Sequence, residues 1–180
     1  MSFDSFYNKI TIDYKNDNKY FEGYLKNCLF NGIGTLFYDN GNKFYEGYFV
    51  DGKMEGRGIT YYCNGIKFYE GEYKNSNHEG KGICYYENGN KWYEGQYKNG
   101  KREGKGIYYT INGDKRYEGV YKDNKREGHG TEYYYDGSMY YIGQFIDNKK
   151  EYRTLFDIKG TQIYRGHFFR KFLQEISNLW

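Results

Sequence analysis

Proline and alanine are absent from this chain of 180 residues, and aliphatic side chains are sparse. A thick core of the kind that globular enzymes build from leucine and valine cannot come from such a composition. Disorder is not the alternative, because aromatic residues make up 23% of the chain, far more than disordered chains carry. The 26 tyrosines and 25 glycines instead suit a thin β-sheet held together by aromatic packing and tight turns.

Cysteine is scarce too, and Cys28, Cys63 and Cys84 show no CxxC or CxH spacing. This argues against a zinc site and is typical of free thiols in a reducing compartment. No apolar run approaches the roughly 18 residues of a membrane span. The N-terminus lacks the basic and apolar regions of a signal peptide. We expect a soluble intracellular protein of the cytoplasm or cytoskeleton, with no metal and no cofactor.

The formal charge of +3 is too small to indicate nucleic-acid binding. His78, His129 and His167 are scattered, with no nucleophile and base at a recognisable spacing. The glycines do not form a phosphate-binding loop between a strand and a helix. We therefore predict no catalytic residue, no small-molecule substrate and no nucleic-acid partner.

What the chain does contain is a period of 24 residues. A fixed period in the twenties indicates one small supersecondary unit stacked many times. The tripeptide aromatic-Glu-Gly recurs at Phe21-Glu22-Gly23, Tyr45-Glu46-Gly47, Tyr69-Glu70-Gly71, Tyr93-Glu94-Gly95 and Tyr117-Glu118-Gly119. Paired glycines keep the same spacing at Gly32 and Gly34, Gly56 and Gly58, Gly80 and Gly82, Gly104 and Gly106, and Gly128 and Gly130.

Each unit is predicted to be a β-hairpin. Asn99-Gly100 is a strong two-residue turn signal, and Asn112-Gly113 closes the other end of the unit. Joining such hairpins gives an all-β fold, an elongated single-layer antiparallel β-meander. Alternation along a strand places Tyr93, Gly95 and Tyr97 on one face.

Two columns of this meander invite a physical interpretation. Glycine inside a strand is unfavourable by roughly 0.5–1 kcal/mol relative to alanine, so the paired glycines need a reason. We predict that aromatic rings lie over them in troughs. For the column of glutamates we predict a structural role, as partners of opposite charge across strands. The expected partners are the residues between the paired glycines, Arg57, Lys81, Lys105 and His129.

The repeat degenerates at both ends. We expect a half-repeat cap over residues 1–20, five regular repeats over 21–140, a degenerate repeat over 141–166 and a short C-terminal α-helix over 167–180. One apolar stripe of this amphipathic helix holds Phe169, Phe172, Leu173, Ile176 and Trp180. The stripe fits a lid over the last hairpin, a partner-docking helix or a membrane-surface helix.

The unit from Tyr93 to Gly106 resembles the MORN repeat (membrane occupation and recognition nexus), and five good copies cover most of the chain. The unit here is one residue longer than the usual MORN unit, which makes the bacterial MORN-like subfamily a relative to consider. The resemblance implies a non-catalytic sheet that serves in cytoskeletal or membrane-associated assemblies.

Three functions remain open at this point. The first is a structural scaffold that binds other protein subunits of a cytoskeletal assembly, most concretely a ciliary or axonemal complex of a protist, like a radial spoke. The second is an adaptor that binds anionic membrane lipid through a basic edge, formed by Lys101, Arg102, Lys125, Arg126, Lys149 and Lys150 in equivalent turns. The third is a bacterial MORN-like antitoxin or immunity protein.

Overall fold

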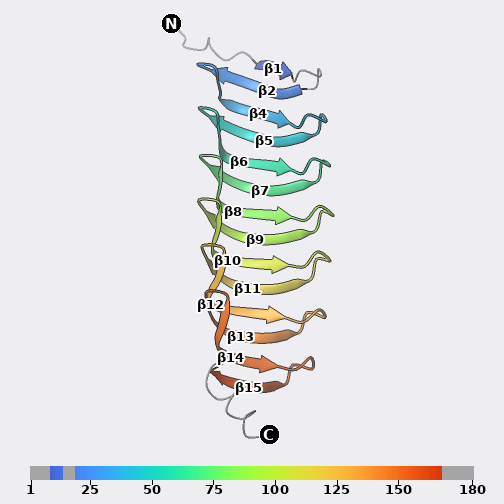
Figure 1. Ribbon diagram of the computed structural model, residues 1–180, viewed down its shortest axis with the longest axis vertical. Helices are drawn as coiled ribbons and strands as arrows, with labels where there is room; N and C mark the ends of the chain where they lie inside the picture. Colours follow the sequence, from blue (N-terminus) through green and yellow to red (C-terminus); the bar gives the residue numbers. More distant parts are fainter. Residues whose placement is uncertain (1–8, 14–18, 168–180) are drawn as a thin grey trace. The chain divides into compact units, whose positions relative to one another are not determined.

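The computed structural model describes residues 9–13 and 19–167, apart from the side chains of Tyr152, Arg153 and His167. All regular structure in these residues is β-strand (Figure 1). The strands are β1 (Lys9–Asp13), β2 (Lys19–Lys26), β3 (Leu29–Phe30), β4 (Gly32–Phe37), β5 (Lys43–Val50), β6 (Lys53–Tyr61), β7 (Lys67–Lys74), β8 (Asn77–Tyr85), β9 (Lys91–Lys98), β10 (Lys101–Tyr109), β11 (Lys115–Lys122), β12 (Lys125–Tyr133), β13 (Met139–Ile146), β14 (Lys149–Phe156) and β15 (Gln162–His167).

The chain divides into two compact units. The first holds residues 1–91 and 97–100, and the second holds residues 92–96 and 101–180, so that β9 contributes to both. In the first unit each strand from β4 to β7 pairs antiparallel with the next, and β2 pairs with β1, β3 and β4. In the second unit β10 to β15 pair in the same way. The predicted antiparallel meander of hairpins is confirmed for each unit.

Each hairpin tip is a two-residue turn in the left-handed region. Asn99 and Gly100 have φ angles of 50° and 77°, the type I′ combination that the Asn-Gly signal predicts. The first glycine of each pair also has a left-handed backbone conformation. Gly104 has a φ of 67°, and Gly56 has a φ of 65° with open space where a Cβ would lie. The prediction of a ring over these first glycines is therefore wrong at Gly56, where the backbone conformation is the reason for glycine.

The second glycine of each pair does form the predicted trough. A Cβ added to Gly106 would lie 2.2 Å from the Tyr93 hydroxyl oxygen, and one added to Gly95 would lie 2.5 Å from it. Tyr93 itself is 0% exposed. The same arrangement recurs with Tyr45 over Gly47 and Gly58. Glycine is needed at these positions because each ring lies directly on the backbone of the sheet.

The buried rings form a core within each unit. Edge-to-face contacts link Tyr45 to Phe49 at 5.0 Å and to Tyr73 at 5.3 Å between ring centroids. In the second unit Tyr117 contacts Tyr121 at 5.3 Å and Phe145 at 5.2 Å. This T-shaped geometry sets the positive edge of one ring against the negative face of the next. The aromatic composition thus replaces the missing aliphatic core.

The glutamate column is structural in its contacts, but the predicted cross-strand partners are wrong. Glu46 lies opposite Ile59, and Arg57 lies opposite Glu72. Glu46 instead forms an ion pair with Lys43 three residues earlier and accepts a 2.7 Å hydrogen bond from the Tyr61 hydroxyl. The pairing of Gly47 with Gly58 sets this outcome, because it places Glu46 and Arg57 on opposite sides of the paired glycines, so that they cannot face each other.

A second glutamate column, which the sequence analysis missed, joins neighbouring hairpin tips. The carboxylate of Glu79 accepts a 2.9 Å hydrogen bond from the backbone N–H of Asn99, and Glu103 accepts one of 3.0 Å from Asp123. The Asn124 backbone N–H also donates to the Arg102 carbonyl at 3.1 Å. These bonds satisfy backbone groups that a type I′ turn leaves exposed, and they tie each tip to the one before it.

At the N-terminal end β1 pairs with β2, with Ile10 opposite Gly23 and Ile12 opposite Phe21. Ile10 stands where regular repeats have the second glycine of the pair, as expected for an atypical terminal unit. The division into a cap, regular repeats and a degenerate repeat stays a prediction. The C-terminal helix predicted over residues 167–180 lies outside the described residues, except for the backbone of His167 in β15.

Candidate functional site

The six basic residues predicted to line one edge separate into two sets. Lys101 and Lys125 are exposed on the turns and form ion pairs with Asp123 and Asp147 of the following turns. Lys149 is exposed at the equivalent place. Arg102, Arg126 and Lys150 instead lie over aromatic rings of the second unit. One contiguous basic edge is therefore not what these side chains form, although their role in lipid binding stays a prediction.

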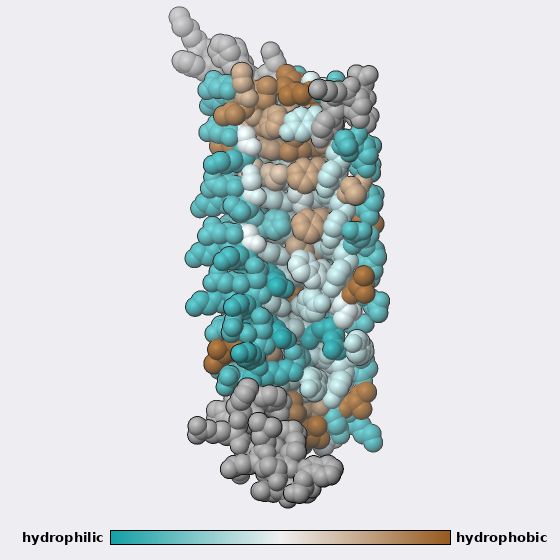
Figure 2. Space-filling view, viewed as in Figure 1, coloured by the Kyte–Doolittle hydropathy of each residue, from teal (hydrophilic) through white to brown (hydrophobic). Residues whose placement is uncertain are grey.

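The second set belongs to one repeat position, which we call the inner column. Each member lies nine residues after the buried aromatic residue that begins its repeat. The members are Phe30, Met54, His78, Arg102, Arg126 and Lys150. In the space-filling view brown and pale side chains gather over β2 to β6, and teal side chains spread over β10 to β13 (Figure 2). The inner column follows the same change in character, from apolar residues in the first unit to cations in the second.

In the first unit the inner column packs as part of the aromatic core. Phe30 stacks on Phe21 with ring centroids 3.9 Å apart. His78 stacks on Tyr69 at 3.6 Å with an interplanar angle of 7°, and Tyr73 and Tyr97 contact its ring edge-on. Burial among these rings lowers the pKa of His78 to about 4. Its imidazole is therefore neutral at physiological pH and acts as one more flat ring.

This environment predicts a loss of stability in mild acid. Because the pKa of His78 is lower in the folded chain than its ordinary value of about 6.5, the unfolded chain binds the proton more tightly. The His78 contribution is complete above pH 6.5 and is lost as the pH falls toward 4. We expect the free energy of unfolding to drop by roughly 1–3 kcal/mol over this window, after allowance for partial exposure. Urea titrations from pH 7.5 to 4.5 measure this drop.

His78→Met is the matched control, because methionine occupies the same repeat position at Met54. We expect this variant to unfold with a shallower dependence on pH than the unaltered chain. Equal pH dependence of the two proteins would contradict the assignment to His78.

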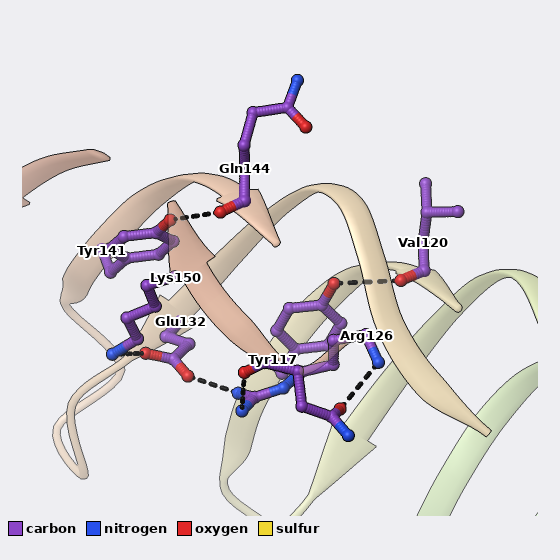
Figure 3. A network of polar contacts seen from close by, with 8 residues as sticks. Tyr117, Val120, Arg126, Glu132, Tyr141, Gln144 and Lys150 are labelled. Atoms are coloured by element: carbon purple, nitrogen blue, oxygen red, sulfur yellow. Dashed lines mark hydrogen bonds and ion pairs between the residues drawn. The ribbon is translucent and has the colours of Figure 1, made fainter. Parts of the chain in front are cut away.

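In the second unit the inner column forms an ionic cluster around one carboxylate. Arg126 Nη1 and Lys150 Nζ both form ion pairs with Glu132 of β12, whose side chain is 15% exposed (Figure 3). Arg126 Nη2 also donates to the Asn148 carbonyl at 3.2 Å. Arg126 lies 5.4 Å from the ring centroid of Tyr117, and Lys150 lies 4.9 Å from that of Tyr141. Cations so placed gain from both the ring faces and the carboxylate.

Arg102 occupies the same position one repeat earlier but has different neighbours. Its guanidinium lies 5.0 to 5.6 Å from the ring centroids of Trp92, Tyr93 and Tyr121. Its Nη2 donates to the Asn124 carbonyl at 2.9 Å. Among the described residues no carboxylate lies within ion-pair distance of Arg102. Tyr108 stands at the repeat position that Glu132 occupies beside Arg126.

The core tyrosines use their hydroxyl groups internally in most repeats. Tyr117 donates to the Val120 carbonyl at 3.1 Å, and Tyr141 donates to the Gln144 carbonyl at 2.8 Å (Figure 3). In the first unit Tyr73 donates to the Thr60 hydroxyl at 3.0 Å, and Tyr97 meets Cys84 Sγ at the same distance. Burial raises the pKa of these core tyrosines, Tyr73 and Tyr117 included. Their phenols stay protonated and act as donors.

Other predicted features have a place in the structure or fall outside it. Cys28 and Cys63 are exposed, Cys84 is buried, and none of them forms a disulfide. The described part of the chain contains no group of three or more His, Cys, Asp or Glu side chains arranged to hold a metal ion. It also contains no helix with the length and hydropathy of a membrane span. The predicted docking residues Phe169, Phe172, Leu173, Ile176 and Trp180 lie outside the described residues.

The sequence analysis missed Glu132 and Tyr121 as members of the site. The sequence does contain a signal for them. Two positions of the repeat, 13 residues apart, vary together from one repeat to the next. Leu36 and Glu132 precede phenylalanines at this spacing, whereas Thr60 and Cys84 precede tyrosines that bond to them. Comparing the repeats with one another, position by position, would have exposed this dependence.

Comparison with known proteins matches the MORN repeat to residues 21–43, 45–67, 69–91, 93–115 and 117–139. One residue lies between each match and the next, and these residues are Phe44, Phe68, Trp92 and Arg116. The added residue of the unit is thus the one before the tripeptide, and at Trp92 its ring faces Arg102. No curated protein matches the chain. The five consecutive matches, together with the hairpin geometry, show that the chain belongs to the MORN repeat family.

Proposed function

We propose that this chain is a non-catalytic scaffold that binds other protein subunits of a cytoskeletal assembly in the cell, most concretely a ciliary or axonemal complex. MORN repeats generally serve as interaction scaffolds for proteins or membrane lipids. The abundance of asparagine, lysine and tyrosine without alanine or proline is typical of an AT-rich genome, such as that of a protist. This last link is an association and not a mechanism.

The observation that carries the proposal is a surface pattern that recurs with the repeat. A lysine, a glutamate and a tyrosine meet on the sheet at Lys67, Glu70 and Tyr85, and again at Lys115, Glu118 and Tyr133. The apolar rings lie inside each unit, so the repeated surface is polar with half-buried tyrosines. A regular array of this kind fits a macromolecular partner better than a small substrate.

Affinity capture from the native source, followed by mass spectrometry and fractionation, tests the proposal. We expect the chain to sediment with cytoskeletal or ciliary material and to retain specific protein subunits. Purified cytoskeletal and ciliary fractions that contain none of the chain would rule the assembly out. Recovery of a single toxin protein would favour the antitoxin function instead.

Lipid binding is the alternative that the turn lysines suggest. Flotation with vesicles rich in phosphatidylserine, compared with vesicles of neutral lipid, tests it. The ion pairs of Lys101 with Asp123 and of Lys125 with Asp147 offset much of the edge charge. We therefore expect no flotation that depends on anionic lipid. Flotation that is lost in the triple variant Lys101→Gln, Lys125→Gln, Lys149→Gln would favour the membrane adaptor.

A further inference from the structure

Two neighbouring repeats show the same arginine with and without its carboxylate. At Arg126 the carboxylate of Glu132 accepts from the guanidinium beneath it. At Arg102, the equivalent arginine, the same position holds Tyr108. The chain therefore displays in one repeat how a carboxylate pairs with the inner column, whereas in the adjacent repeat the arginine bonds to the Asn124 carbonyl and pairs with no carboxylate of the described residues.

A second and independent feature lies at the same place. Tyr121 is only 4% exposed, and its hydroxyl has no hydrogen-bond partner among the described residues. Tyr73 and Tyr97, at the equivalent position, bond to Thr60 and Cys84. A buried polar group without a partner is unfavourable and uncommon in folded proteins. Burial raises the pKa of Tyr121 to about 12, so its phenol is protonated and able to donate.

Both features call for the same missing group. The Arg102 guanidinium lies 5.0 Å from the ring centroid of Tyr121, and among the described residues no carboxylate pairs with Arg102 and no acceptor bonds to the Tyr121 hydroxyl. A carboxylate satisfies both, since each of its two oxygens accepts hydrogen bonds. Trp92, 5.5 Å from the guanidinium, and Tyr93 give the arginine an aromatic surround. Arginine, tryptophan and tyrosine are the residues that dominate binding at protein interfaces.

We propose that Arg102 and Tyr121 form a recognition site for an Asp or Glu side chain of a partner protein, which pairs with Arg102 as Glu132 pairs with Arg126. The site rests on the proposed function only in taking a protein as the partner. Trp92, Tyr93 and Tyr108 form its aromatic rim.

The surroundings favour a protein segment over a membrane surface. Arg102 is half-buried among rings, whereas the carboxylates on the neighbouring turns project, with the Asp123 side chain 61% and that of Asp147 55% exposed. An anionic bilayer approaching the turns would meet these aspartates. A peptide side chain is narrow enough to pass them and reach the guanidinium.

A selection of random twelve-residue peptides displayed on phage tests the site on the whole chain. We expect the selected peptides to be enriched in Asp and Glu, and their amide analogues with Asn and Gln to bind at least about tenfold more weakly, as a lost charge-assisted contact predicts. Arg102→Gln and Tyr121→Phe should each weaken binding in fluorescence anisotropy. Tyr108→Glu should abolish it, because the variant supplies its own carboxylate.

Matched controls separate the site from general charge and from folding. Lys101→Gln removes the same charge one residue away and should leave affinity within about twofold, because Lys101 is exposed and paired with Asp123. Tyr121→Phe should melt no lower than the unaltered chain, since phenylalanine fills this position at Phe49 and Phe145. Tyr73→Phe, which loses its bond to Thr60, should melt lower.

Three results would overturn the site: a selection without acidic enrichment, acidic peptides that Arg102→Gln binds as well as the unaltered chain, or equal losses in Lys101→Gln and Arg102→Gln. Anionic vesicles bound through Arg102 would overturn it in favour of lipid. A different result refutes the proposed scaffold function: affinity capture from the native source that yields no protein subunit. If Arg102→Gln captures the same subunits as well as the unaltered chain does, the scaffold function is supported and the recognition site at Arg102 is refuted.

Discussion

Gly106→Val is expected to lower the free energy of unfolding by about 3–5 kcal/mol, the range of severe overpacking in a buried site. An added Cβ would lie 2.2 Å from the Tyr93 hydroxyl oxygen and 2.5 Å from Cζ. The ring has no room to retreat, because Gly95 lies beneath it, and Arg102 and Tyr121 lie against it. Local preference predicts the opposite sign, since valine favours strands more than glycine does.

Denaturant unfolding of three variants measures this effect. Lys105→Ala, at the neighbouring exposed position, should stay within about 0.5 kcal/mol of the unaltered chain. Gly104→Ala should cost about 1–2 kcal/mol, because Gly104 has a φ of 67° and an added Cβ would also displace the flexible side chain of Gln96. Equal stabilities of Gly106→Val and Lys105→Ala would contradict the trough.

Phe145→Ala is expected to cost a similar amount, about 3–5 kcal/mol, which is the usual range for a buried phenylalanine. Phe145 is 0% exposed and makes edge-to-face contacts with Tyr117 at 5.2 Å and Tyr141 at 5.0 Å. Arg126 also lies 4.9 Å from its ring centroid. Its removal leaves a cavity bordered by two rings and a cation, and rings held in troughs cannot close it.

Ile146→Ala is the control for this variant, because Ile146 is adjacent but 53% exposed. We expect it to change the free energy of unfolding by less than about 0.5 kcal/mol, as other exposed substitutions do. Comparable losses of unfolding free energy in the two variants would show that the buried aromatic core does not carry the stability of the second unit.

How well the sequence predicts the structure differs from one repeat position to another. Asn99-Gly100 predicted its turn because few dipeptides accept two left-handed residues in succession. Tyr93 over Gly106 followed from alternation along a strand, a local rule. The partners of Glu46 did not follow, since Gly47 pairs with Gly58 and this register places Ile59, not Arg57, opposite Glu46. Alternation sorts the faces of one strand and does not fix the register of its neighbour.

The candidate site was predicted only in part. Arg102 and Arg126 were recognised as equivalent and basic, but they were assigned to an exposed edge together with Lys101 and Lys125. Arg102 and Arg126 lie between a hairpin tip and the left-handed Gly104 or Gly128, and each lies over the ring of its own repeat. Neighbours in sequence thus differ in burial and in partners.

By itself the sequence determined the repeat, the hairpin, the turn type and the family, because each depends on residues close together in the chain. Only the tertiary structure decided which glycines admit a ring and which accept a left-handed backbone. It also decided that Glu132 lies between two cations while Arg102 pairs with no carboxylate in the part of the chain that the structure describes. These outcomes depend on contacts between strands and between successive tips, where register and backbone bends set which side chains meet.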